Sequence, residues 1–169
     1  MASPRQPSTR STLRAFQQLH RGGLDPGFMA DVELLRHKDL DLSIKLGALL
    51  TFDALIIGAG VLPVSASPGA PLSVDAWNDP AIVIAAMLGV ALLAWSALYC
   101  VRGVMIGEEF DSAGLEDDAA SVAVRLFAAY CAAIDKQESM LWRAARLTIA
   151  GGAVVALALI WALADKWVG

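Results

Sequence analysis

The sequence has few charged residues for its length, and they avoid its longest apolar segments. Only 18% of the 169 residues are charged, whereas 57% are hydrophobic, and this balance excludes an ordinary water-soluble domain of this size. The apolar residues gather in three blocks, 46–62, 81–101 and 147–164. Each block is long enough to cross a hydrocarbon layer of about 30 Å as a helix, the first with some tilt or local thinning. The sequence therefore predicts three transmembrane helices.

The residue patterns of common enzymes and metal sites are also absent. There is no phosphate-binding glycine loop, nucleophile elbow, HExxH pair, or haem or iron–sulfur spacing. The two cysteines, Cys100 and Cys131, have no neighbouring cysteine or histidine at ligand spacing, and on the cytoplasmic side their thiols stay reduced. We expect a chain that is not an enzyme and that has no catalytic residues, metal site, cofactor or nucleic-acid partner.

Basic residues are missing from one side of the predicted membrane. The connection 63–80 has no Lys or Arg, and the tail 165–169 has only Lys166. The other twelve precede the first block or separate the second from the third: Arg5, Arg10, Arg14, Arg21, Arg36, Lys38 and Lys45, then Arg102, Arg125, Lys136, Arg143 and Arg146. Cytoplasmic flanks carry such an excess. We expect a multi-pass protein of the bacterial inner membrane with a cytoplasmic N-terminus and a periplasmic C-terminus.

Two cytoplasmic segments have a helical pattern that leads into a membrane span. Residues 28–62 read as a polar helix that continues into the first span. Residues 102–146 read as a linker and a long helix before the third span at 147–164. The residues of its predicted packed face are spaced alternately by four and three, which is typical of a helix packed in a coiled-coil manner. They are Leu126, Tyr130, Ala133, Gln137, Met140 and Ala144. The predicted fold is an all-α integral membrane protein with three transmembrane helices and long cytoplasmic helical extensions of the first and third spans.

The remaining segments connect or flank these helices. Residues 1–27 carry four arginines among Ser, Pro and Gln, a composition typical of a basic, disordered arm. Residues 63–80 form an irregular outer loop before the second span at 81–101, and residues 165–169 form a short outer tail.

Asp53 is the only formal charge inside the three blocks. A charge at membrane depth costs on the order of 3 kcal/mol, so it is expected to face protein or water rather than lipid. One interpretation is structural, with Trp95 or Ser96, at about the same depth, as hydrogen-bond donors. A second is that Asp53 side chains of several copies line a pathway between subunits. A third places the helix boundary elsewhere, with Asp53 among the headgroups.

The first block also carries small residues along one face. They recur at steps of four, three and four: Gly47, Thr51, Ala54 and Gly58. Such a stripe lets a second helix approach closely. It predicts a homo-oligomer within the lipid bilayer.

Two stretches resemble a known family. They are LDLSIKLGALLTF at residues 40–52 and YCAAIDKQESMLWRAARLTIAGG at residues 130–152. Across about residues 28–165 the layout resembles the small membrane effectors of bacterial Pycsar antiphage systems, although the Ala expected after the Lys that leads into the first span is Leu46 here. The resemblance implies a protein that senses a cyclic pyrimidine mononucleotide, cyclic UMP or cyclic CMP, made by a partner cyclase. It further implies that the protein then impairs the inner membrane.

A cyclic phosphate needs a cationic or N–H partner. The chemical candidates on the cytoplasmic side are Arg36, Lys38, Arg125, Lys136, Arg143 and Arg146. Two other interpretations stay open. One is a noncatalytic accessory subunit that packs against other subunits of a larger bacterial membrane complex, and the other is a holin-like pore former that needs no ligand.

Overall fold

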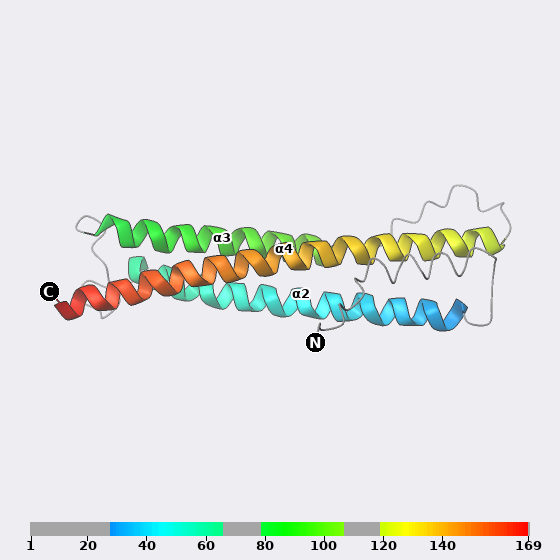
Figure 1. Cartoon of the computed structure of the whole chain (residues 1–169), viewed down its shortest axis with the longest axis horizontal. Helices are drawn as coiled ribbons and strands as arrows, with labels where there is room; N and C mark the ends of the chain where they lie inside the picture. The colour runs from blue at the N-terminus through cyan, green and yellow to red at the C-terminus, as the bar shows by residue number, and fades with distance from the viewer. Residues whose placement is uncertain (1–27, 66–78, 107–118, 169) are drawn as a thin grey trace, which may run out of the picture. The chain divides into compact units, whose positions relative to one another are not determined.

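The computed structural model describes residues 28–65, 79–106 and 119–168, and its regular elements there are helices (Figure 1). Helix α2 covers Phe28–Ser65, α3 covers Pro80–Val104 and α4 covers Ala119–Val168. The all-helical class is confirmed for this part of the chain. The predicted arm 1–27, most of the predicted outer loop 63–80 and residues 107–118 of the predicted linker lie outside the described residues.

All three helices are long and apolar enough to cross a membrane. The qualifying segments are Ala30–Val61, Pro80–Val104 and Arg125–Trp167, and they contain the three apolar blocks except for Leu62. Large apolar side chains also point outward from these helices, such as Leu55 at 70% exposure and Ile149 at 72%. Apolar surface of this kind suits lipid or another helix rather than water. The prediction of three helices of this length and composition is confirmed.

The chain divides into two compact units. One contains residues up to Ser43 together with Met105–Ser139, and the other contains Ile44–Val104 together with Met140–Gly169. We call them the polar-helix unit and the span unit. Helices α2 and α4 contribute residues to both, whereas α3 belongs to the span unit.

The span unit is held together by a heptad-like seam. On α3 the buried residues alternate at steps of four and three: Ile82, Ala86, Gly89, Leu93, Ser96, Cys100 and Gly103. On α2 the buried positions Leu46, Asp53 and Gly60 are seven residues apart. This spacing is that of helices packed with knobs into holes.

Small residues let these helices approach closely. A Cβ added at Gly89 would lie 3.0 Å from the Gly151 carbonyl oxygen, and one added at Gly151 would lie 2.9 Å from the Gly89 carbonyl oxygen. At another point, a Cβ on Gly103 would meet the Leu46 side chain at 2.8 Å. Leu46, Cys100 and Ala144 form a buried apolar cluster with one member from each helix.

The polar-helix unit has a smaller buried face. Phe28 of α2 and Phe127 of α4 are in contact, with ring centroids 6.0 Å apart. Of the predicted seam positions of α4, Gln137 and Ala144 are buried. The first three positions differ by one residue, since Phe127, Cys131 and Ile134 are buried whereas Leu126, Tyr130 and Ala133 are half-buried. Packing of the larger Phe127 ring against Phe28 explains the difference in this first part of the helix.

Candidate functional site

The most unusual group in the span unit is the carboxyl of Asp53. It lies at a seam position of α2, seven residues after Leu46, and its exposed fraction is 0%. The same heptad pattern that buries Leu46 therefore buries Asp53. A carboxyl group in such a place needs hydrogen-bond donors from the helices around it.

One hydroxyl donor comes from α4, and a second hydroxyl, on α3, lies beside it. The Thr148 hydroxyl of α4 donates to Asp53 Oδ1 at 2.7 Å. The hydroxyl oxygens of Ser96, on α3, and Thr148 are 2.9 Å apart. Because the Thr148 proton points to Asp53, the single Ser96 proton is shared between Thr148 and the Ala144 carbonyl oxygen, which lies 3.0 Å away. Asp53, Ser96 and Thr148 are all buried. We call these three residues the polar layer.

The polar layer agrees only in part with the two donors expected from the sequence. Ser96 belongs to the layer but reaches Asp53 through Thr148, and Thr148 was not anticipated. Trp95 has an exposed fraction of 59%, as expected for the residue beside a seam position. The donor to Asp53 is therefore Thr148, and the Trp95 side chain is largely exposed.

One oxygen of the polar layer is left over. Asp53 Oδ2 is buried and has no hydrogen-bond partner in the described part of the chain. A buried acceptor without a donor costs about 1–3 kcal/mol, so Asp53 Oδ2 lowers the stability of the layer as it stands. Asp53 is enclosed by the helices of one chain, so a pathway lined by several copies would require these helices to rearrange.

The polar-helix unit contains a second buried polar group, Gln137. Its exposed fraction is 1%, and its amide nitrogen donates to the Ile106 carbonyl oxygen at 3.4 Å. Its amide oxygen is buried and has no partner among the described residues. The sequence pattern placed Gln137 on the packed face of the helix but did not select it as a site residue.

The six candidate phosphate partners do not gather in one unit. Arg36, Lys38, Arg125 and Lys136 belong to the polar-helix unit, whereas Arg143 and Arg146 belong to the span unit. Lys38 is half-buried and the other five are exposed. Their positions alone therefore define no anion site.

The small-residue stripe lies on the outer side of α2. Thr51, Ala54 and Gly58 are exposed and Gly47 is half-buried. A Cβ added at Gly47 or Gly58 would meet nothing within 4 Å. The glycines that pack inside the chain are different ones, including Gly89 and Gly151, so the stripe is available to another helix.

Within the described ranges, no three His, Cys, Asp or Glu side chains are placed to hold a metal ion. What the geometry offers instead is two buried polar positions, the layer around Asp53 and the amide of Gln137. Comparison of the chain with protein-family models, with curated proteins and with solved structures found no match.

Proposed function

We propose that the chain is a membrane effector of bacterial antiphage defence. In this proposal it lies in the inner membrane, with its polar-helix unit in the cytoplasm. That unit senses a cyclic pyrimidine mononucleotide, and the span units of several copies then impair the membrane. The support from the sequence is the resemblance of residues 28–165 to Pycsar effectors and the concentration of basic residues on one side.

The observation that carries the proposal is the division of two single helices between two units. Helix α2 passes from one unit to the other between Ser43 and Ile44, and α4 does so between Ser139 and Met140. Each helix therefore joins a segment that can meet a soluble ligand to a segment that is apolar enough to cross lipid. A ligand can shift such a protein only if its affinity differs between two arrangements.

The polar atom best suited to read a pyrimidine base in the polar-helix unit is Gln137 Oε1. It is buried and has no donor in the ranges 28–65, 79–106 and 119–168. Both uracil and cytosine carry N–H groups that can donate to an amide oxygen. A donor from the base would remove the cost of this unpaired acceptor. The exposed Arg and Lys side chains of the same unit would then donate hydrogen bonds to the cyclic phosphate.

Calorimetry on the purified full chain in detergent tests this assignment. We expect wild type to bind cyclic UMP or cyclic CMP and to ignore cyclic AMP. Gln137→Leu should lose the binding while its unfolding temperature stays close to that of wild type, because loss of the long 3.4 Å bond to Ile106 is offset by removal of the buried Oε1. Binding that survives in Gln137→Leu would remove the role of Gln137, and absence of binding by wild type would remove the effector proposal.

A second candidate function is supported by the outward stripe of Gly47, Thr51, Ala54 and Gly58. A surface without bulky side chains suits a helix of a different protein as well as a second copy. In that case the chain would be a noncatalytic accessory subunit of a larger membrane complex. Gentle purification from the native membrane separates the two, because an accessory subunit brings its partners in fixed ratio and a homo-oligomer does not.

A further inference from the structure

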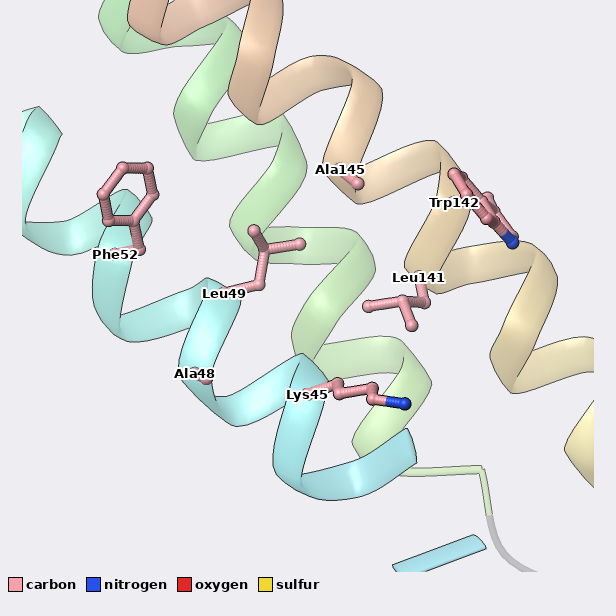
Figure 2. Close-up of a pocket in the computed structure, with 7 residues that line it drawn as sticks. All are labelled: Lys45, Ala48, Leu49, Phe52, Leu141, Trp142 and Ala145. Atoms are coloured by element: carbon pink, nitrogen blue, oxygen red, sulfur yellow. The ribbon is translucent and has the colours of Figure 1, made fainter. Parts of the chain in front are cut away.

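A groove of about 460 Å³ runs between α2 and α4 in the span unit (Figure 2). Leu49 of α2 and Leu141 of α4 point toward the space between these helices, and the Lys45 side chain extends from α2 toward α4. Lys45, Leu49, Phe52, Leu141 and Trp142 are among its lining residues, and two alanines complete the lining. The volume lies within the range of about 300–1,000 Å³ that is common for ligand sites.

The lining selects the chemistry of an occupant. Lys45 is its only charged residue, and the other six are apolar. A nucleotide or an extended peptide would bury hydroxyl or backbone groups here without partners, at a cost in free energy. A hydrocarbon chain has no such groups, so it fits the lining without that cost.

The groove lies at the end of the apolar blocks. Lys45 directly precedes the block 46–62, and Trp142 comes five residues before the block 147–164. Tryptophan and lysine are the side chains expected where hydrocarbon meets the headgroups, since the indole is amphipathic and the lysine stem lets the ammonium reach the polar layer of the bilayer.

The charges at this end of the span unit are positive. Arg102, Arg143 and Arg146 are exposed and join Lys45 there, and the nearest acidic residues along the two groove helices, Asp41 and Glu138, lie about one turn further from the apolar blocks. An ammonium has three N–H donors. Lys45 can therefore donate to a phosphate oxygen while it keeps its interaction within the chain.

We propose that this groove binds one anionic phospholipid of the adjacent leaflet, with an acyl chain between Leu49 and Leu141 and the phosphate at Lys45. Cations close to the membrane attract anionic headgroups. The inference concerns the span unit alone and does not depend on nucleotide sensing.

Fluorescence quenching of Trp142 in liposomes tests the proposal. The protein keeps Trp142 while Trp77, Trp95, Trp161 and Trp167 are changed to Phe, and the bilayer is phosphatidylcholine with a small fraction of brominated lipid. We expect brominated phosphatidylglycerol to quench Trp142 more than the same fraction of brominated phosphatidylcholine. Lys45→Gln should abolish this preference, and Ala145→Leu, which fills the groove, should reduce quenching by both lipids.

Two controls come from the same chain. A variant that keeps only Trp95, which is 59% exposed on α3, should be quenched equally by both lipids. Ala91→Leu, at an exposed α3 position outside the groove, should leave Trp142 quenching unchanged. Equal quenching of Trp142 by the two lipids would show annular contact only and overturn the proposal. Absence of quenching by either lipid would place protein, such as a second copy, in the groove and would also overturn it.

A second measurement is the unfolding temperature of the protein with all of its native tryptophans. Phosphatidylglycerol added to the protein in detergent should raise the unfolding temperature of wild type more than phosphatidylcholine does, and this difference should vanish in Lys45→Gln. An equal shift with both lipids in wild type would contradict a headgroup site at Lys45.

Discussion

At the scale of single residues, the polar layer is where the span unit departs from a purely apolar seam. Asp53, Ser96 and Thr148 each occupy a buried position on a different helix. Sliding one helix by a heptad would place the Asp53 carboxyl against apolar groups and leave both its oxygens without donors. Buried polar groups of this kind set the register of packed helices, so we expect the layer to specify how α2, α3 and α4 align in the span unit.

Thr148→Val should destabilise the protein by about 1–3 kcal/mol, because it removes the donor to Asp53 and leaves a buried carboxyl unpaired. Asp53→Asn retains an acceptor for Thr148 and should cost less, about 1 kcal/mol or below. Thr51→Val is the matched control, since the Thr51 hydroxyl is exposed and donates to the Gly47 carbonyl oxygen of its own helix at 3.0 Å. Reversible unfolding in mixed detergent micelles measures all three. A cost for Thr51→Val equal to that for Thr148→Val would contradict this role of the layer.

Part of the polar layer could be predicted from the sequence and part could not. Asp53 is conspicuous as a charge inside an apolar block, and Ser96 lies at a matching depth in the second block. Thr148 gave no signal of its own, because threonine is common in membrane helices and this one is 95 residues from Asp53. Ala144, Thr148 and Gly151 are spaced by four and three residues, and all three are buried. Extension of the predicted seam beyond Ala144 would therefore have placed Thr148 on the buried face.

At the scale of elements, glycines determine how closely the helices of the span unit pack. Gly151→Ala puts a methyl group 2.9 Å from the Gly89 carbonyl oxygen, so the backbones must separate, and overpacking of this kind costs about 1–3 kcal/mol. Gly47→Ala meets nothing within 4 Å and should be neutral or slightly stabilising. The unfolding free energies of the two variants test this contrast, and equal values would mean that α3 and α4 do not cross at these glycines.

Gly58→Leu addresses the outer face of α2. The position is exposed and open, so the substitution should leave the fold of one chain intact and weaken self-association through the stripe. Leu55→Ala, off the stripe at 70% exposure, should weaken it less. Cross-linking in mild detergent and in nanodiscs measures the oligomer. A wild-type protein that is monomeric in both would refute this function of the stripe.

The helix pattern was predicted better in the spans than outside them. A long apolar run predicts a helix that is long enough to cross a membrane, and the structure contains three helices of this length and composition. In the polar-helix unit the repeat of fours and threes has the right period, but its phase is ambiguous, since apolar residues occupy adjacent positions such as Leu126 and Phe127. Contact with Phe28, more than 90 residues earlier, decides the phase, and no local pattern contains that contact.

At the scale of the whole molecule, the distribution of Lys and Arg predicts the orientation in the membrane. A reporter fused after Gly169 should be active as a periplasmic protein, and one inserted near Gly114 should be active as a cytoplasmic protein. The reason is that twelve of the thirteen basic residues lie on one predicted side. The reverse activity at either point would contradict an odd number of spans or the predicted orientation.

The central claim is that a cyclic pyrimidine nucleotide makes this protein disrupt a membrane. Ion flux from liposomes that contain the full chain tests it most directly, with cyclic UMP, cyclic CMP or cyclic AMP added on the side of the polar-helix unit. We predict flux with at least one of the pyrimidine nucleotides and none with cyclic AMP. If the wild-type Asp53 carboxylate lines the ion pathway, Asp53→Asn should reduce this flux. If Asp53 is only a packed structural residue, Asp53→Asn should leave the flux unchanged. No flux from correctly inserted wild-type protein with any nucleotide, or equal flux without one, would contradict the claim.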